Sequence, residues 1–232
     1  MDSIAERLQA TQNKISDLVT KADRTSNEVR LVAVSKTQPA SIIREAFMAG
    51  QSIFGENYVQ EALNKQIELI DLPIEWHFIG PIQSNKTHLI AKHFDWVHGI
   101  DRLKIAERLD QARSSSDRQL QVCLQVNTSN EPTKSGVLPD DVMELAKAVA
   151  KLPHLKLRGL MTIPEPTSDE ALQRERFRLL RNLLDEINRN GLFLDTLSMG
   201  MSDDYVIAIE EGATIVRIGS AIFGKRRPKS QV

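Results

Sequence analysis

Short apolar runs alternate with amphipathic segments along almost the whole chain. Eight apolar or β-branched runs are typical of strands, at 30–35, 52–55, 75–80, 95–100, 120–127, 155–163, 195–200 and 214–219. The segments between them carry apolar residues at helical spacing, and the longest covers 169–189 before Asn190-Gly191 ends it. Strands that alternate with helices in this way predict a parallel sheet.

The number of strands favours a closed sheet. Eight parallel strands that close form a (β/α)8 barrel, whereas an open arrangement forms a doubly wound sheet. Before the first strand, Ser3 and Glu6 form a capping-box pattern that opens one more helix, which ends near Lys21. We expect this extra N-terminal helix to cover one end of the barrel. We also predict that residues 1–232 form a single domain, because β/α barrels commonly reach this length undivided.

Composition narrows the possible partners. The formal net charge is −1, so no global positive field would attract nucleic acid or an anionic membrane. The N-terminal segment is polar, and no stretch approaches the ~18 apolar residues of a membrane span. Cys123, the only cysteine, lies in the apolar run QVCLQV and is expected to be a buried thiol. We therefore expect a cytoplasmic protein that binds neither membrane nor nucleic acid.

Polar residues gather where the predicted strands end, which is where barrels form their active sites. Lys36 follows the first strand, Asn57 the second, Ser198 and Gly200 the seventh, and Gly219 with Ser220 the eighth. Each of the motifs SMGMSDD and RIGSAIFG, taken alone, is ordinary turn chemistry. Loops after the last two strands are nevertheless a recurring phosphate site in barrels, so together the motifs indicate a phosphorylated ligand.

Lys36 and Arg217 each allow two interpretations. Lys36 either extends from a strand end into water or supplies an amine for a Schiff base, which an apolar approach and a nearby guanidinium would favour. In a closed barrel the first strand lies beside the eighth, so Lys36 should stand next to the phosphate-binding turns. Arg217 either faces outward to pair with a carboxylate or faces inward as a fixed cation.

Other sites are less favoured by the sequence. No HExxH or Cys/His cluster occurs, so we predict no metal site, and GxGxxG, GxxxxGK[ST] and GxSxG are all missing. We interpret His77 as a buried core histidine in preference to one that lines the barrel and faces a ligand. We expect Asp203 and Asp204 to cap a helix that opens near Asp203.

Six motifs together carry a family resemblance: AVSKTQPA, FGENYVQEA, EWHFIGPIQSNK, GLMTIP, LSMGMSDD and VRIGSAIFG. From about residue 2 to Gly224 the chain resembles the pyridoxal phosphate homeostasis proteins of the bacterial YggS/PROSC type. The resemblance implies a single barrel of the alanine racemase N-terminal-domain type (fold type III of pyridoxal phosphate proteins), without the racemases' β domain.

The resemblance also implies site roles. Lys36 would hold pyridoxal 5′-phosphate as a Schiff base, Arg217 would face the pyridine nitrogen, and Asn57 would lie near the cofactor. The phosphate would be bound by Ser198, Gly200, Gly219 and Ser220. Met161 and His77 would pack near the ring, and Lys134 matches a lysine connected with cofactor handling in relatives.

The implied function is homeostasis of intracellular pyridoxal phosphate (vitamin B6), without established turnover and with no catalytic residue. A guanidinium at the pyridine nitrogen leaves that nitrogen unprotonated and supports carbanion chemistry poorly. A racemase-like amino-acid enzyme is the first alternative; it is disfavoured because we expect no β domain before the chain ends at Val232. An aldolase that uses Lys36 without a cofactor is the second. We expect a monomer that passes its cofactor to apo-enzymes.

Overall fold

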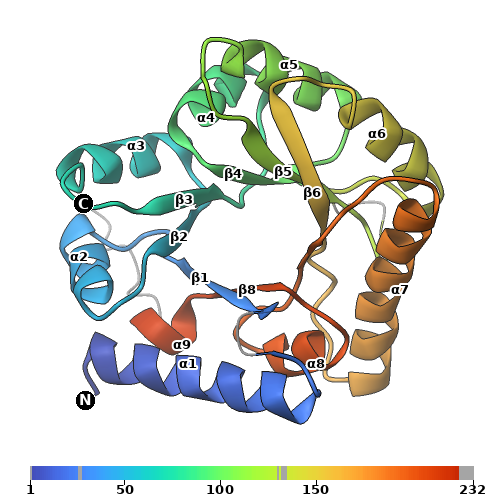
Figure 1. Ribbon diagram of the computed structural model, residues 1–232. Coiled ribbons are helices and arrows are strands. Elements are labelled where there is room, and N and C mark those ends of the chain that lie inside the picture. The colour runs from blue at the N-terminus through green and yellow to red at the C-terminus, as the bar shows by residue number, and fades with distance from the viewer. Residues whose placement is uncertain (1, 26–27, 130, 132–134, 225–232) are drawn as a thin grey trace.

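The eight predicted strands form a closed parallel barrel in the order β1 to β8, with β1 paired to β8 (Figure 1). The structure is a computed structural model that describes residues 2–25, 28–129, 131 and 135–224. The predicted (β/α)8 architecture is thus confirmed. Within these residues, no helix is both long enough and apolar enough to cross a membrane.

The strands are β1 (Arg30–Val34), β2 (Ile53–Glu56), β3 (Glu75–Phe78), β4 (Trp96–Ile100), β5 (Leu120–Gln125), β6 (Leu155–Met161), β7 (Thr196–Ser198) and β8 (Ile215–Ile218). The helices are α1 (Ile4–Lys21), α2 (Ala40–Met48), α3 (Val59–Glu68), α4 (Thr87–His93), α5 (Leu103–Arg113), α6 (Val142–Val149), α7 (Glu170–Arg189), α8 (Tyr205–Glu210) and α9 (Ser220–Phe223). Short 3-10 helices lie at Ser84–Lys86 and Pro139–Asp141.

The main apolar core lies between the barrel and its ring of helices. Alternate residues of each strand point outward, so that Val216 and Ile218 of β8 and Val97 of β4 pack against helices. A smaller apolar cluster occupies the barrel interior and consists of Val32, Trp96, Cys123, Met161 and Ile215. Cys123 has no exposed surface, as the sequence predicted.

Helix α1 has a different place from the one expected. Its capping box is present, because Ser3 and Glu6 exchange hydrogen bonds. However, α1 does not close an end of the barrel; it lies in the outer ring between α2 and α8, over α9 (Figure 1). The apolar stripe of α1 is buried where it packs against the four-residue α9 and against α8 and α2.

Candidate functional site

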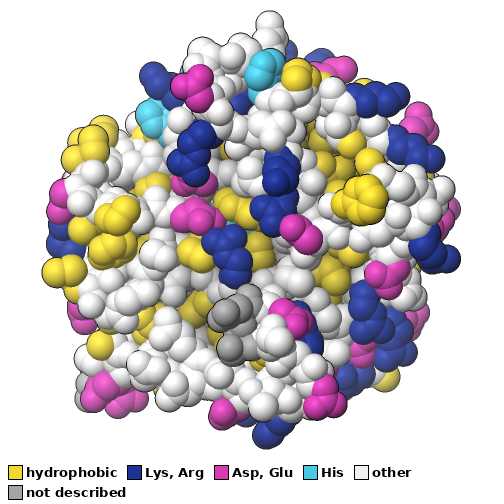
Figure 2. Space-filling view, viewed as in Figure 1, with side chains coloured by type: hydrophobic (Ala, Val, Ile, Leu, Met, Phe, Trp, Pro, Cys, Tyr) yellow, Lys and Arg dark blue, Asp and Glu magenta, His cyan; other side chains and the backbone are white. Residues whose placement is uncertain are grey.

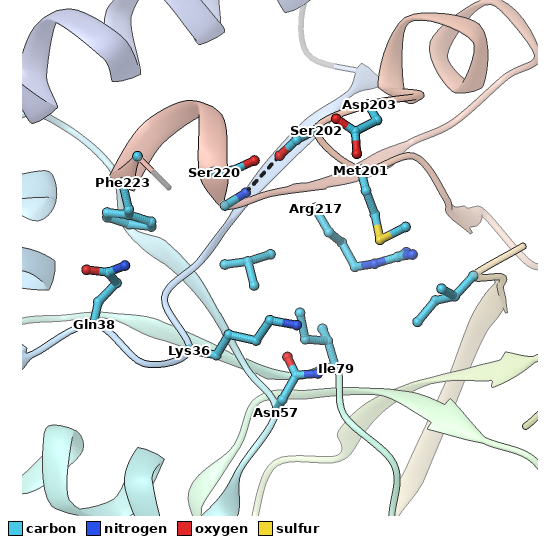
Figure 3. A pocket seen from close by; sticks show the side chains of 14 residues that line it. Lys36, Gln38, Asn57, Ile79, Met201, Ser202, Asp203, Arg217, Ser220 and Phe223 are labelled. Carbon is cyan, nitrogen blue, oxygen red and sulfur yellow. Dashed lines mark hydrogen bonds between the residues drawn. The ribbon is translucent and has the colours of Figure 1, made fainter. Parts of the chain in front are cut away.

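A pocket of about 250 Å³ opens at the carboxyl ends of the strands (Figure 3). It is lined by Val34, Lys36, Gln38, Asn57, Ile79, Ile163, Met201, Ser202, Asp203, Arg217, Gly219, Ser220, Phe223 and Gly224. Five of the predicted site residues therefore meet here: Lys36, Asn57, Arg217, Gly219 and Ser220. Closure between β1 and β8 brings the two ends of the chain to one site.

Lys36 follows β1 in a loop whose neighbouring residues are held in place. The backbone N–H of Ser35 donates to the Gly55 carbonyl at 3.0 Å, and that of Thr37 donates to Glu61 Oε1 at 2.5 Å. Thr37 has a φ of +67°, a left-handed conformation that is unfavourable for a β-branched residue. Because Glu61 stabilises that conformation, the loop directs the Lys36 side chain into the pocket (Figure 3).

Behind this loop, Lys65 of α3 forms a buried ion pair with Glu56. Its Nζ lies 2.7 Å from Glu56 Oε1 and 2.6 Å from Glu61 Oε1, and it donates to the Ser35 carbonyl at 2.9 Å. Burial raises the pKa of the Glu56 carboxyl, although the charge and hydrogen bond of Lys65 oppose this shift. One buried lysine therefore ties α3 to the end of β1 and fixes the start of the loop that carries Lys36.

Arg217 of β8 points into the barrel, which resolves the choice that the sequence left open (Figure 3). Its Nη1 donates to Ser198 Oγ at 2.7 Å, and its Nη2 donates to the Thr162 carbonyl at 2.8 Å. Burial lowers the pKa of Arg217 to about 10, against the opposing charge of Asp204. The guanidinium is therefore still protonated at neutral pH and acts as a fixed donor.

Asn57, the first residue after β2, lies beside Lys36 in the pocket (Figure 3). Gly80 allows this placement, since a Cβ at position 80 would lie 2.3 Å from the Asn57 carbonyl oxygen. The side-chain Oδ1 of Asn57 is buried and has no hydrogen-bond partner in the described part of the chain. A buried acceptor left unpaired costs about 1–3 kcal/mol, so the pocket is suited to a ligand with a donor at this point.

Two turns form the side of the pocket next to β7 and β8. Gly200 has a φ of +91°, and a Cβ there would lie 2.6 Å from a side-chain atom of α8, so glycine is required. The backbone N–H of Gly219 donates to Ser202 Oγ at 3.4 Å, which joins the two turns (Figure 3). Helix α9 begins at Ser220, and its first N–H groups have no partner within the helix, so they can bind an anion.

Ser198 and Gly200, both predicted to hold a phosphate, do not line the pocket. Ser198 has no exposed surface, and its Oγ lies between Arg217 and Nδ1 of His98. The Gly200 carbonyl accepts the backbone N–H of Arg217 at 2.9 Å. The structure thus places both residues where they orient Arg217 and the turn.

The structure also changes the set of residues around the ligand space. Met161 and His77 are buried in the barrel and do not line the pocket, whereas Ile163 and Met201 do. Three further residues line the pocket but were not predicted as site residues: Ile163, Met201 and Ser202. The motifs GLMTIP and LSMGMSDD contain them. Lys134 lies outside the described residues.

Asp204 caps the turn before α8, because its Oδ1 accepts the Met201 N–H at 2.6 Å. The helix begins at Tyr205, two residues later than expected, and Asp203 lines the pocket. Burial raises the pKa of Asp204, with the Met201 hydrogen bond and Arg217 opposing. No group of three or more His, Cys, Asp or Glu side chains in the described ranges could hold a metal ion.

The chain is similar in sequence and in fold to known proteins. Residues 7–227 match the family model of the alanine racemase N-terminal domain. The pyridoxal phosphate homeostasis protein of Pseudomonas aeruginosa is 58% identical over 226 residues, which is 97% of each chain. The protein of the same name from Escherichia coli K12 is 50% identical over 229 residues, which is 97% of this chain and 98% of the relative.

Solved structures agree with these relatives. PipY of Synechococcus elongatus PCC7942 is 40% identical over 96% of this chain and all of its own, with TM-scores of 0.87 without pyridoxal phosphate and 0.83 with it bound. An alanine racemase of Clostridium difficile 630 has a TM-score of 0.75 at 14% identity and is covered over 58% of its length, a likeness that shows the shared barrel alone. The resemblance seen in the sequence is confirmed, and the chain belongs to the pyridoxal phosphate homeostasis protein family, on the alanine racemase N-terminal-domain barrel.

Proposed function

We propose that this chain binds pyridoxal 5′-phosphate in the pocket at the carboxyl ends of its strands and contributes to the homeostasis of that cofactor. The observation that carries the proposal is the meeting of Lys36, Arg217 and the start of α9 in one pocket. The Pseudomonas aeruginosa relative is named for this role, and a PipY structure contains bound pyridoxal phosphate.

The pocket residues suit the chemical groups of this cofactor. Pyridoxal phosphate supplies an aldehyde, with which a primary amine condenses to a Schiff base and releases water. Lys36 provides that amine, and Arg217 provides donors for the ring nitrogen. Ser202 and the Gly219–Ser220 turn provide hydroxyl and N–H groups for the phosphate, and Asn57 Oδ1 accepts a further hydrogen bond.

Arg217 and the names of the relatives together favour a carrier over an enzyme. A guanidinium with a pKa of about 10 keeps its proton at neutral pH, so a pyridine nitrogen facing it stays unprotonated. An unprotonated ring withdraws electrons weakly and stabilises a carbanion poorly. The names of the relatives also describe homeostasis and not a catalysed reaction.

The decisive experiment compares wild type with Lys36→Ala and with Lys104→Ala, a control at an exposed lysine on α5. Wild type and Lys104→Ala should gain an absorbance band near ~420 nm with pyridoxal phosphate, and Lys36→Ala should not, because the Schiff base needs that amine. Borohydride reduction followed by peptide mass spectrometry should place the label on Lys36. A wild-type protein that stays colourless would contradict the proposal and favour the cofactor-free aldolase.

Incubating the loaded protein with L-alanine distinguishes the racemase alternative. We expect no D-alanine. Production of D-alanine that scales with protein and vanishes in Lys36→Ala would establish the racemase.

We further infer that residues 1–232 act as one binding unit, in the cytoplasm, as a monomer that passes pyridoxal phosphate to apo-enzymes. The single buried cysteine, which can form no disulfide within the chain, supports the cytoplasm as the compartment. Light scattering should give the monomer mass of 26.1 kDa.

Activation of an apo-enzyme by the loaded protein should persist when a phosphatase destroys free pyridoxal phosphate. Activation that stops would show release into solution in place of direct transfer.

A further inference from the structure

A row of hydrogen-bonded polar side chains runs along the inside of the barrel, from its amino end to the pocket. At the amino end, Glu75 Oε1 lies 2.7 Å from His77 Nε2. His77 Nδ1 lies 2.9 Å from His98 Nε2, and His98 Nδ1 lies 2.8 Å from Ser198 Oγ. Ser198 Oγ then accepts from Arg217 at the pocket. We call these five residues the polar column.

The carboxylate end of the polar column sets the direction of its hydrogen bonds when both rings are neutral. Glu75 can only accept, so His77 carries its proton on Nε2 and accepts at Nδ1. His98 then donates from Nε2 to His77 and accepts the hydrogen of Ser198 Oγ at Nδ1. At the other end Arg217 can only donate, and it binds a lone pair of the same Oγ.

Both histidines of the column are neutral in this arrangement. Burial is the main cause that lowers the pKa of His77 and, more strongly, that of His98. Among the neighbouring charges, Glu75 and Asp95 raise the pKa of His77 and Arg30 lowers it; Arg217 and Arg30 both lower that of His98. A second proton on His77 would sit on Nδ1 and face the N–H of His98, donor against donor.

The surroundings hold the column in this geometry. His77 stacks on Trp96 with ring centroids 5.3 Å apart and planes 15° apart, which fixes the plane of its imidazole. Arg30 donates to Glu75 Oε1 at 2.8 Å, the same oxygen that accepts from His77. Burial raises the pKa of Glu75, but its hydrogen bonds with His77 and Arg30 and the charge of Arg30 oppose this and keep the pKa below its ordinary value. Glu75 is therefore ionised at neutral pH.

The column ends on Arg217, the residue proposed to donate to the ring nitrogen of the cofactor. Arg217 is buried, and its side-chain hydrogen bonds within the described residues go to two uncharged acceptors, Ser198 Oγ and the Thr162 carbonyl. While the hydrogen of Ser198 Oγ points toward His98, the lone pairs of that oxygen are left for Arg217. The tautomer of His98 thus sets the rotation of the Ser198 hydroxyl, and thereby the direction of the acceptor that orients the guanidinium.

We propose that Glu75, His77 and His98 are positioning residues, which hold Arg217 in the orientation that donates to the ring nitrogen of the cofactor. This inference rests on the proposed binding of pyridoxal phosphate. None of the three lines the pocket, so they act only through Ser198 and Arg217.

The first test needs no cofactor. In the 15N-labelled protein without pyridoxal phosphate, long-range NMR correlations should show His77 and His98 as neutral Nε2–H tautomers from about pH 5 to 8. A neutral Nδ1–H tautomer, or protonation of either ring in this range, would overturn the column even if the cofactor binds as proposed.

The second test measures the absorbance spectrum and the binding of the cofactor. Glu75→Gln keeps an acceptor oxygen at a half-exposed position but removes the charge, and His98→Leu interrupts the column. Asp110→Asn and His154→Leu are matched controls, because Asp110 and His154 form a carboxylate–imidazole pair on the outside of the barrel, 3.2 Å apart. Folding of every variant is checked by circular dichroism and thermal unfolding.

We expect the loaded His98→Leu protein to show a shifted absorbance maximum, a shifted pH midpoint of its spectrum and about tenfold weaker binding, the equivalent of one charge-assisted hydrogen bond. Glu75→Gln should shift the same quantities in the same direction by less, and both controls should match wild type. If His98→Leu does not fold, Glu75→Gln alone decides. A folded, loaded Glu75→Gln with the spectrum and pH midpoint of Asp110→Asn refutes the proposal, whereas wild type without any band refutes cofactor binding itself.

Discussion

At the scale of single residues, the buried Lys65 holds the start of the loop that contains Lys36. Its ammonium group contacts the carboxylates of Glu56 and Glu61 and donates to the carbonyl of Ser35, the residue before Lys36. Replacing Lys65 by Met leaves Glu56 as an unpaired buried carboxyl, which should lower the free energy of unfolding by about 3–5 kcal/mol. Chemical denaturation at pH 7 measures this change, and cofactor titration should show weaker binding because the loop of Lys36 loses its support.

The pH dependence of the same variant gives a second check. Because the pKa of Glu56 is raised in the folded protein above its ordinary value of 4.5, the folded state takes up a proton there more readily than the unfolded chain. In Lys65→Met the pKa of Glu56 should rise further, because the charge and hydrogen bond of Lys65 no longer oppose the effect of burial. The loss of stability relative to wild type should thus be smallest at acid pH, where Glu56 is protonated in both folded proteins, and grow as the pH rises above the raised pKa of the wild type. Adding Glu56→Leu should restore most of the stability; a double variant as unstable as the single one would contradict this account.

At the scale of elements, α1 contacts α9, which borders the pocket next to β8, although no residue of α1 lines the pocket. Arg7 Nε donates to the carbonyl of Ile222 at 2.6 Å, near the end of the short α9 that begins at Ser220. Arg7→Met should cost about 1.5–3 kcal/mol of stability, the value of a hydrogen bond to a charged group, and should weaken cofactor binding. Lys14→Met, at an exposed position of the same helix, is the control. Equal affinity in the two variants would show that α9 needs no support from α1.

The elements themselves were largely predictable, whereas their orientations were not. The predicted run 214–219 contains the observed strand Ile215–Ile218, because a strand that is buried on both faces must be mostly apolar. The same pattern cannot say which face of β8 carries Arg217, since that depends on the register with β1, where Val32 pairs with Arg217. The pattern also did not predict that α1 lies in the outer ring, because that position depends on its packing against α9, α8 and α2.

The polar column shows the same limit more clearly. His77 and His98 stand in separate runs with nothing in the sequence to connect them, although His77 was interpreted as a core histidine and is buried. They meet only because β3 and β4 are neighbours and both residues face inward. Ser198 was recognised as a site residue, but its role at Arg217 depends on the packing of β7 beside β8.

At the scale of the whole molecule, the site exists only when the ring is closed. Lys36 follows β1 and Arg217 lies in β8, and these strands pair although they come from opposite ends of the chain. A ligand that contacts both binds the folded state and not the unfolded chain, so its binding energy adds to global stability. A probe that is buried in the barrel interior and does not line the pocket should therefore report pocket occupancy.

Cys123 is such a probe. It is the only cysteine, has no exposed surface, and burial raises the pKa of its thiol to about 12. The folded protein should not react with a disulfide reagent such as DTNB, and labelling should follow transient global unfolding and accelerate with denaturant. At a pyridoxal phosphate concentration of 100 times Kd, labelling of wild type should slow about 100-fold, because the unfolded population falls by that factor. Lys36→Ala should lose most of this protection. Labelling that is fast without denaturant, or that ignores the cofactor in wild type, would show that the barrel opens locally around β5 and that the pocket and interior do not unfold as one unit.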